Sequence, residues 1–263
     1  MVLDKIFIVK QLTVDFRCCV AEGSLSVDSK SNIRSTIKSY PLSTIHQMTN
    51  PLDLLLAEIN KPDREIDLSK AALHIAQIEY PNLDIDRYLQ QLDTMGAEIA
   101  TRLPATQYPL KTIQTINQYL YTELNFYGNE RDYYNPHNSF LNDAIDRRTG
   151  IPITLAVIYL HIAKVIDFPM VGIGMPGHFL IRPNFENAGI FVDVFDRGET
   201  LFVEDCRQKL MNIYKQDIPF LPPEILQPVT NRQILLRILN NLQATYLNQP
   251  DFNRALVIKQ WIK

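Results

Sequence analysis

The chain has few of the residues that would mark a particular class of protein at once. Among its 263 residues there are only three cysteines, nine glycines and one tryptophan. Cys18 and Cys19 are adjacent and Cys206 stands alone, so no pair has metal-ligand spacing. This argues against a disulfide scaffold and against a cysteine zinc site. So few cysteines are typical of a reducing compartment, and we expect a cytoplasmic protein.

Strong charge imbalance and long apolar runs are also missing. Lys plus Arg number 26 and Asp plus Glu 29, a net charge of −3, so no global field would attract nucleic acid or an anionic membrane. The longest uncharged run, 149–163, is shorter than the roughly 20 residues that span a bilayer. Charged residues interrupt the apolar start of the chain, so no signal-peptide core is seen. We expect a soluble, intracellular protein with no membrane or nucleic-acid partner.

The hydrophobic content of 46% is ordinary for a folded protein of this length. Residues 1–49 read as a poorly ordered extension, because 22–50 is rich in Ser, Thr and Asn, with one possible strand at 5–16. From residue 51 apolar residues recur at helical spacing. Proline-marked breaks separate the resulting stripes and predict a helical domain over 51–127, with helices at 52–59, 68–78, 85–103 and 110–124.

The next region, 128–218, combines helices and strands. Asn138 or Ser139 would cap a short helix ending at Arg147, and a strongly apolar helix follows over 151–166, with Pro152 in its first turn. Strands rich in Val, Ile and Phe are predicted at 170–175, 178–182 and 190–195, and a helix at 202–214. Short links between successive strands favour an antiparallel sheet, so the fold class is α+β.

The last section, 229–263, predicts a helical hairpin with helices at 234–247 and 251–262. Its sequence NNLQATYLNQPDFNRAL is similar to a single tetratricopeptide-type repeat, with Leu242, Tyr246, Phe252 and Ala255 at packing positions. One repeat cannot bury its own apolar face, so we expect the hairpin to dock on the rest of the chain or on a partner. Its basic residues, which include Arg232, Arg237 and Arg254, are expected on a solvated face, with contact to an acidic partner as the alternative.

The most informative stretch for chemistry is 138–196. His178 and Asp193 fall on neighbouring predicted strands, where the carboxylate would fix the imidazole tautomer and raise its basicity. The start of the apolar helix would face this pair, and free N–H groups at a helix start stabilise a thiolate or an anion. This is the layout of a Cys-His-Asp site on a papain-like core. His74 and His161 have no second ligand at helical spacing, which argues against zinc, and no cofactor is expected.

Three strings in this stretch carry a family resemblance: NSFLNDAIDRRTGIPITLAVIY, MPGHFLIR and FVDVFDRGE. Together they resemble the transglutaminase-like core of the bacterial SirB type, which is also found in an F-box protein of animals. The resemblance covers roughly 51–215, and the repeat-like tail matches the usual companion of this core. It implies a central helix on a small sheet, with His178 and Asp193 as the family's His and Asp.

The resemblance also locates the family's catalytic cysteine, and there this chain departs. The Gly-x-Cys of the superfamily falls on 150–152, so the nucleophile position holds Pro152. Proline has no nucleophilic atom, and thiol acyl transfer is therefore not expected. Thr154 is two residues away, a rotation of about 200° around the helix, so capping or a hydrogen bond to His178 is the simpler role. Cys206 is expected to be a structural or surface thiol.

Two further readings concern binding. Asn138, Arg148, Thr154, His178 and Asp193 would form a pocket for an anionic group, rimmed by Tyr133, Tyr134 and His137. Local ion pairing of Arg147 and Arg148 is the structural alternative. Our leading hypothesis is a non-catalytic protein that binds a protein, peptide or small acidic ligand at the relict site, with a tail for protein interaction. A hydrolase or acyl transferase using His178, Asp193 and Thr154 or an activated water remains open, as does a module working through the hairpin alone.

Overall fold

The computed structural model describes residues 50–104, 108–185, 188–248 and 252–262. The extension 1–49 and its possible strand at 5–16 lie outside the described residues. Residues Pro51–Lys263 form a single compact unit by their mutual contacts. The finer division of this unit into a helical domain, a core and a hairpin stays a prediction.

Helices make up the first part of the described unit. Asp67 and Asp84 each cap a helix, accepting a hydrogen bond from the backbone N–H three residues on. Helix α5 begins with Pro109 and continues directly into a π-helical turn, η2. The elements are α2 (Pro51–Ile59), η1 (Asp63–Glu65), α3 (Leu68–Ala76), α4 (Ile85–Ala100), α5 (Pro109–Asn117) and η2 (Gln118–Glu123).

A short helix and a long buried one follow. They are preceded by β1 (Tyr127–Gly128) and η3 (Pro136–Asn138), and comprise α6 (Leu141–Arg147), β2 (Thr149–Gly150) and α7 (Pro152–Val165). Strand β1 pairs in parallel with β2. The prediction that Asn138 or Ser139 caps α6 is wrong: the N-cap is Phe140, because Asn138 lies in η3 and its amide bonds to loop carbonyls instead. Arg148 ends α6 in the left-handed conformation, with φ of 56°.

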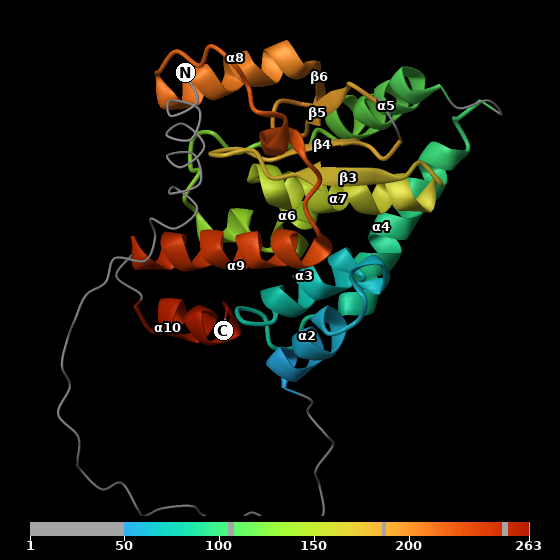
Figure 1. Cartoon of the computed structure of the whole chain (residues 1–263). Coiled ribbons are helices and arrows are strands. Elements are labelled where there is room, and N and C mark those ends of the chain that lie inside the picture. Colours follow the sequence, from blue (N-terminus) through green and yellow to red (C-terminus); the bar gives the residue numbers. More distant parts are fainter. Residues whose placement is uncertain (1–49, 105–107, 186–187, 249–251, 263) are drawn as a thin grey trace, which may run out of the picture. The chain divides into compact units, whose positions relative to one another are not determined.

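The sheet is antiparallel, with strand order β3-β4-β5-β6. Its strands are β3 (Met170–Ile173), β4 (Leu180–Pro183), β5 (Phe191–Asp193) and β6 (Glu199–Leu201). Helix α7 contacts β3 and β4, and α8 (Val203–Tyr214) contacts β6 (Figure 1). A small antiparallel sheet among helices confirms the α+β fold class.

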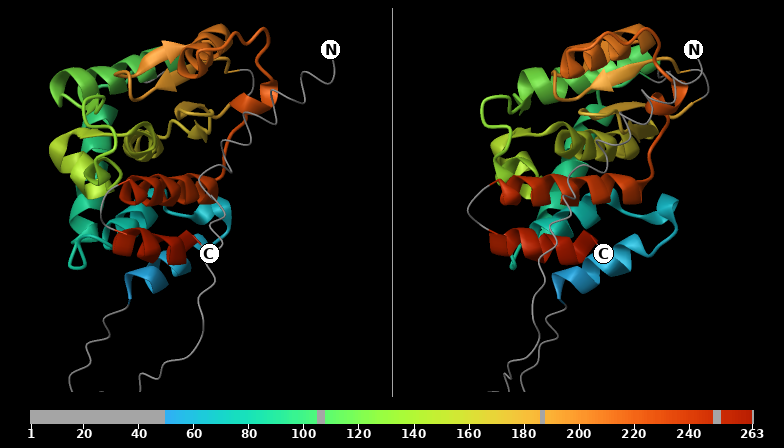
Figure 2. Two further views of the ribbon diagram at one scale, coloured as in Figure 1. Left: turned by 90° about the vertical axis from the view of Figure 1, so that its left-hand side faces the viewer. Right: turned by 60° about the vertical axis from the view of Figure 1, so that its left-hand side comes forward.

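The chain closes with η4 (Pro223–Leu226), α9 (Asn231–Leu247) and α10 (Phe252–Ile262). Helix α9 lies between α10 and the layer that contains α7, and both views of Figure 2 show α9 and α10 side by side. The core includes the α9 side chains Ile234, Ile238 and Leu242, and Ile258 of α10. The hairpin is therefore docked on the rest of the unit, which is one of the two outcomes expected from the sequence; the other was docking on a partner. Within the described ranges, no helix is long and apolar enough to cross a bilayer.

Candidate functional site

His178 stands at the end of a tight turn between β3 and β4. Its N–H donates to the carbonyl of Met175 at 3.1 Å, and Pro176 and Gly177 fill the central positions, with Gly177 at φ of 70°. Proline first and a positive-φ glycine second define a type II turn. A Cβ on Gly177 would also lie 2.9 Å from Ile213. The turn therefore fixes the backbone of His178 just before the return strand.

Asp193 ends β5, and its side chain is fully buried. Its Oδ2 lies 2.7 Å from Nε2 of His178, the contact expected between these two side chains. Its Oδ1 accepts the backbone N–H groups of Phe195 at 3.0 Å and Asp196 at 3.3 Å. Because the carboxylate can only accept, Nε2 of His178 donates this hydrogen bond, and in the neutral imidazole Nδ1 is then the acceptor. Among the described residues, no group bonds to Nδ1.

A lysine from α8 completes the cluster. Lys209 Nζ donates to Oδ2 of Asp193 and lies 3.4 Å from Glu199 and 3.5 Å from Asp196. Burial alone would raise the pKa of Asp193, but the hydrogen bonds and charges of His178 and Lys209 lower it to about 2. Burial acts against the charge of Lys209 as well, yet the Asp193 hydrogen bond and the nearby carboxylates raise its pKa. We call His178, Asp193 and Lys209 the His178 cluster.

An aromatic row leads from His178 to the surface. The His178 ring makes an edge contact with Phe195 at a centroid distance of 6.2 Å, and Phe195 makes another with Tyr133 at 5.9 Å. Tyr133 then contacts Tyr134, whose side chain is 67% exposed. The His178 side chain is itself 12% exposed. Two of the three expected rim residues therefore connect to His178, through Phe195.

The start of α7 is held by backbone hydrogen bonds to the preceding loop. Tyr127 N–H donates to the carbonyl of Arg148 at 3.0 Å, and Ile151 N–H donates to that of Asn138 at 3.2 Å. Pro152 is buried in the first turn of the helix, where its missing N–H costs no hydrogen bond. The start of this central helix thus presents no thiol or hydroxyl at that position.

A sequence profile described as the transglutaminase-like superfamily matches residues 86–240, which include α7 and the whole His178 cluster. The chain belongs to the transglutaminase-like superfamily. This agrees with the family expected from the residues around the helix start, His178 and Asp193.

Individual proteins are also similar to this chain. A UPF0162 protein of Xylella fastidiosa (strain 9a5c) is 34% identical over 220 residues, 80% of this chain and 75% of that protein. A UPF0162 protein of Vibrio cholerae serotype O1 is 27% identical over 190 residues, 72% of this chain and 67% of that protein. F-box only protein 21 of Homo sapiens is 30% identical over 172 residues, 62% of this chain but 26% of that protein. No solved structure matches the chain significantly.

In this transglutaminase-like chain, Thr154 does not bond to His178. Its side chain is 1% exposed, and its Oγ1 has no hydrogen-bond partner among the described residues. A general base must be within hydrogen-bond reach of the hydroxyl that it activates. The structure therefore gives no geometric support to Thr154 as a substitute nucleophile.

Arg148 is directed to a different group from the one expected. Its side chain is exposed, and its guanidinium donates to the carbonyl of Leu124 at 2.8 Å, at the end of η2. The partners of the Asp193 carboxylate are His178, Lys209 and two backbone N–H groups, so Arg148 is not one of them. The cationic partner of this transglutaminase-like site is Lys209 instead.

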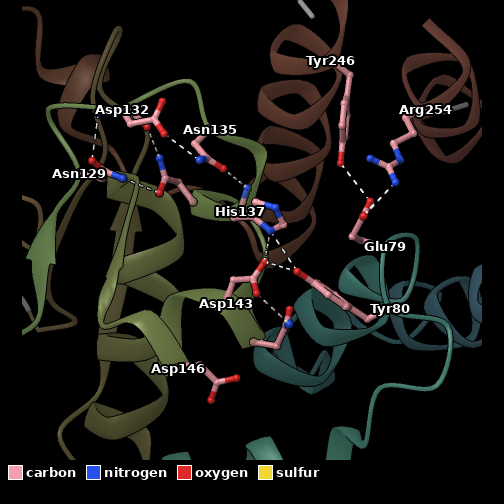
Figure 3. A network of polar contacts seen from close by, with 12 residues as sticks. Glu79, Tyr80, Asn129, Asp132, Asn135, His137, Asp143, Asp146, Tyr246 and Arg254 are labelled. Carbon is pink, nitrogen blue, oxygen red and sulfur yellow. Dashed lines mark hydrogen bonds and ion pairs between the residues drawn. The ribbon is translucent and has the colours of Figure 1, made fainter. Parts of the chain in front are cut away.

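Asn138 and His137 belong to a polar network that shapes the loop before α6. The side chain of Asn138 is fully buried; its amide group donates to the carbonyl of Asp132 at 2.6 Å and its oxygen accepts from Asn129 at 3.0 Å. His137 Nδ1 lies 2.7 Å from Asp143, which also accepts the Tyr80 hydroxyl (Figure 3). These contacts are with the loop, α6 and Tyr80 after α3, and none of these groups is a partner of the Asp193 carboxylate.

Cys206 lies on α8 and is fully buried. Burial, with Asp205 and Asp193 adding to it, raises the pKa of its thiol to about 12. A protonated, enclosed thiol is a poor nucleophile, which agrees with a structural role.

Sequence reasoning missed Lys209 and misread Arg237. A signal for Lys209 existed: it follows Cys206 by three residues and precedes Leu210, and both neighbours are on the buried face of α8. Arg237 is not on a solvated face, because it donates to the carbonyls of Met175 and His178. Arg232 and Arg254 are exposed, as predicted; Arg232 also donates to the carbonyls of Ile59 and Lys61, and Arg254 pairs with Glu79. These arginines join the tail to the rest of the fold.

Proposed function

We propose that this transglutaminase-like chain has no thiol acyl-transfer activity and instead binds a protein or peptide segment at the His178 cluster. The absence of thiol acyl transfer is inferred from the residue at the start of α7, Pro152. By the family resemblance, Pro152 takes the place of the nucleophilic cysteine, and it has no reactive atom. Cys206, the thiol of the described part, is buried with a raised pKa and cannot replace it.

Peptide binding is inferred from Nδ1 of His178 and from the exposed part of its ring. Nε2 is committed to Asp193, while Nδ1 has no partner within the described ranges and the side chain keeps 12% of its surface exposed. The aromatic row of Phe195, Tyr133 and Tyr134 provides a flat apolar surface beside it. An acceptor nitrogen next to aromatic rings suits a peptide N–H donor with an apolar neighbour.

The charge around the cluster favours a neutral or basic peptide over a small acidic ligand. Lys209 faces the carboxylates of Asp193, Asp196 and Glu199, so its charge is already balanced. The acidic-ligand hypothesis relied on Arg148, whose guanidinium bonds to the Leu124 carbonyl. A ligand carboxylate beside Asp193, Asp196 and Glu199 would add a like charge to these carboxylates without adding a cation.

The absence of thiol chemistry is tested by amine incorporation into a glutamine-containing protein such as casein. We expect no incorporation by the purified chain above a no-enzyme control. Replacement of Pro152 by Cys is the informative variant, since it restores a thiol at the family's position. Incorporation by the wild type would overturn this half of the proposal.

Binding is tested with an array of peptides that differ in charge and aromatic content, followed by anisotropy titration of the best binder. We expect His178→Ala to weaken binding at least about tenfold, the scale of one lost hydrogen bond with its packing. Arg148→Ala is the matched control, because the Arg148 guanidinium donates to the Leu124 carbonyl and not to the His178 cluster. This variant should bind the peptide normally. Equal affinity for wild type and His178→Ala, with both folded by circular dichroism, would remove the cluster from the binding surface.

We also propose that the α9–α10 hairpin contacts a protein partner, in the manner of a tetratricopeptide-type repeat. Its inner face is packed against the unit, but Leu256 is 59% exposed and Val257 is 41% exposed on α10. Leu256→Asp with Val257→Ser would abolish capture of a partner that the wild type retains. If the double variant retained the same partner, the hairpin would be a structural element only.

A further inference from the structure

A second histidine, far from the His178 cluster in the sequence, connects a serine to an aspartate. His161 Nδ1 lies 2.9 Å from the Ser69 hydroxyl, and His161 Nε2 lies 2.9 Å from Asp93 Oδ1. The three side chains come from α3, α7 and α4, which contact one another (Figure 1). The Asp93 carboxylate accepts a hydrogen bond from Nε2–H of His161, so in the neutral imidazole Nδ1 is the acceptor for the serine proton. We call this set the Ser69 chain.

The Ser69 chain lies at the wall of a cavity. The cavity has a volume of about 780 Å³, and both Ser69 and His161 line it. Asp93 and His161 border a second hollow of about 250 Å³, and the two hollows share Asp67, His161 and Lys164. Ser69, which is 2% exposed, and His161 therefore border a space within the usual size range for ligand sites.

Free backbone donors stand next to the serine. Ser69 is the second residue of α3, and the N–H groups of Leu68 and Ser69 have no hydrogen-bond partner among the described residues. The N-cap, Asp67, satisfies Lys70 N–H and leaves these two untouched. Helix-start N–H groups next to a nucleophile are suitable donors to an oxyanion that forms on an attacked carbonyl.

We propose that the Ser69 chain is a hydrolytic site for carboxylic esters with an apolar acyl group. Ser69 Oγ forms a bond to the acyl carbon while its proton passes to Nδ1 of His161. The tetrahedral intermediate then breaks its bond to the alcohol oxygen, which takes that proton and leaves. Water, deprotonated by His161 in the same way, attacks the acyl-serine ester and releases the acid and the free hydroxyl.

The substrate class follows from the lining of the cavity. Apolar side chains form much of its wall: Ile66, Leu68, Leu160, Phe168, Val171 and Val229. The lining also carries both signs of charge, with Asp63, Asp67 and Asp167 against Arg64 and Lys164. A neutral ester with a short to medium acyl chain is therefore accommodated better than a strongly charged one. This inference is independent of the proposed role of the His178 cluster.

Covalent labelling tests the nucleophile directly. The folded wild type is treated with a fluorophosphonate probe, and the labelled peptide is identified by mass spectrometry. We expect the label on Ser69 and its complete loss in Ser69→Ala. Ser139→Ala is the matched control, because Ser139 is also buried, at 4% exposed, but lies outside the Ser69 chain. An unlabelled wild type, or labelling that persists in Ser69→Ala, would overturn the proposal.

Hydrolysis of p-nitrophenyl butyrate supplies the second readout. Ser69→Ala and His161→Gln should each lower kcat/KM more than about 100-fold, the usual range for a nucleophile or general base. Ser139→Ala, the matched control, should leave it unchanged. Equal rates for wild type and Ser69→Ala would overturn the site, whatever the outcome at the His178 cluster.

Asp93 acts here as a positioning residue, through His161, and its test is the separate effect of a variant on kcat and on KM. Asp93 Oδ1 lies 2.9 Å from His161 Nε2 and holds the ring in the orientation that accepts the serine proton. Asp93→Asn should therefore lower kcat while KM stays nearly unchanged. Equal kcat for wild type and Asp93→Asn would contradict the positioning role.

Discussion

His178 and His161, two of the described histidines that bond to an aspartate, have aspartate partners with opposite surroundings. Asp193 is fully buried and accepts donors on both of its oxygens, from His178, Lys209 and the backbone. Asp93 has a side chain that is 63% exposed, and it pairs with His161. The Nδ1 atoms of the two histidines also differ. Nδ1 of His161 contacts the Ser69 hydroxyl, whereas Nδ1 of His178 contacts no described group.

The difference separates the stabilising role of a carboxylate from its catalytic use. A buried carboxylate with several donors joins the strands and helix around it, and its charge is then a condition of folding. An exposed carboxylate contributes little to stability but still orients a histidine. We therefore expect the His178 cluster to control the stability of the unit, and the Ser69 chain to tolerate substitution without unfolding.

The largest expected effect is on the buried side of this comparison. Asp193→Asn leaves Lys209 and His178 without their anion, and should lower the free energy of unfolding by about 3 kcal/mol. Urea denaturation followed by circular dichroism measures the change. Asp196→Asn is the control, because that carboxylate is 64% exposed and lies 3.5 Å from the same lysine. A loss below about 1 kcal/mol for Asp193→Asn would contradict the stabilising role.

Acid should remove the same contribution gradually. The folded-state pKa of Asp193 is lowered from 3.8 to about 2, so its stabilisation is fully present above pH 4 and is lost as the pH falls through about 2. The difference in unfolding free energy between wild type and Asp193→Asn should shrink by about 2 kcal/mol across this window. Urea titrations at closely spaced pH values measure it. A difference that stays constant down to pH 2 would argue against an ionised Asp193.

A smaller effect of opposite sign is expected beside the site. Thr154 Oγ1 is buried without a described partner, so Thr154→Val removes an unsatisfied hydroxyl and should raise the free energy of unfolding by about 1 kcal/mol. The exposed Thr94, whose hydroxyl bonds to the Gln90 carbonyl, is the control for the same substitution. Destabilisation by Thr154→Val would indicate that its hydroxyl makes a necessary contact.

The smallest change in stability is expected on the exposed side. Asp93→Asn should alter the free energy of unfolding by less than about 0.5 kcal/mol, because solvent screens its pair with His161. The same urea experiment used for Asp193 measures this change. A loss above about 1.5 kcal/mol would show that the exposed pair carries stability as well, and would remove the contrast between the two sites.

Local signals predicted much of the fold. Asp84 caps α4, Pro152 begins α7, and the proline at 250 falls between the two helices of the tail. The unpredicted strands, β1, β2 and β6, have two or three residues each, too few for a periodicity to be recognised. Sheet pairing, not sequence pattern, defines them.

The candidate site was predictable only in part, for a related reason. His178, just before β4, and Asp193, at the end of β5, are 15 residues apart, and antiparallel pairing of consecutive strands brings such residues together. Ser69 and His161 are 92 residues apart, and their contact depends on how α3 packs against α7. Arg148 illustrates the opposite error: nearness in sequence to the helix start did not decide where its guanidinium points.

The hydrogen bonds of Arg237 have a consequence for where this chain can be shortened. Its guanidinium, carried by α9, donates to the carbonyls of Met175 and His178, the two ends of the type II turn, and covers the ring of Phe179. A chain ending before α9 would leave both carbonyls without this donor and open the core beneath them. The tail is therefore an integral part of the turn that carries His178, and the smallest autonomous fragment extends past Arg237.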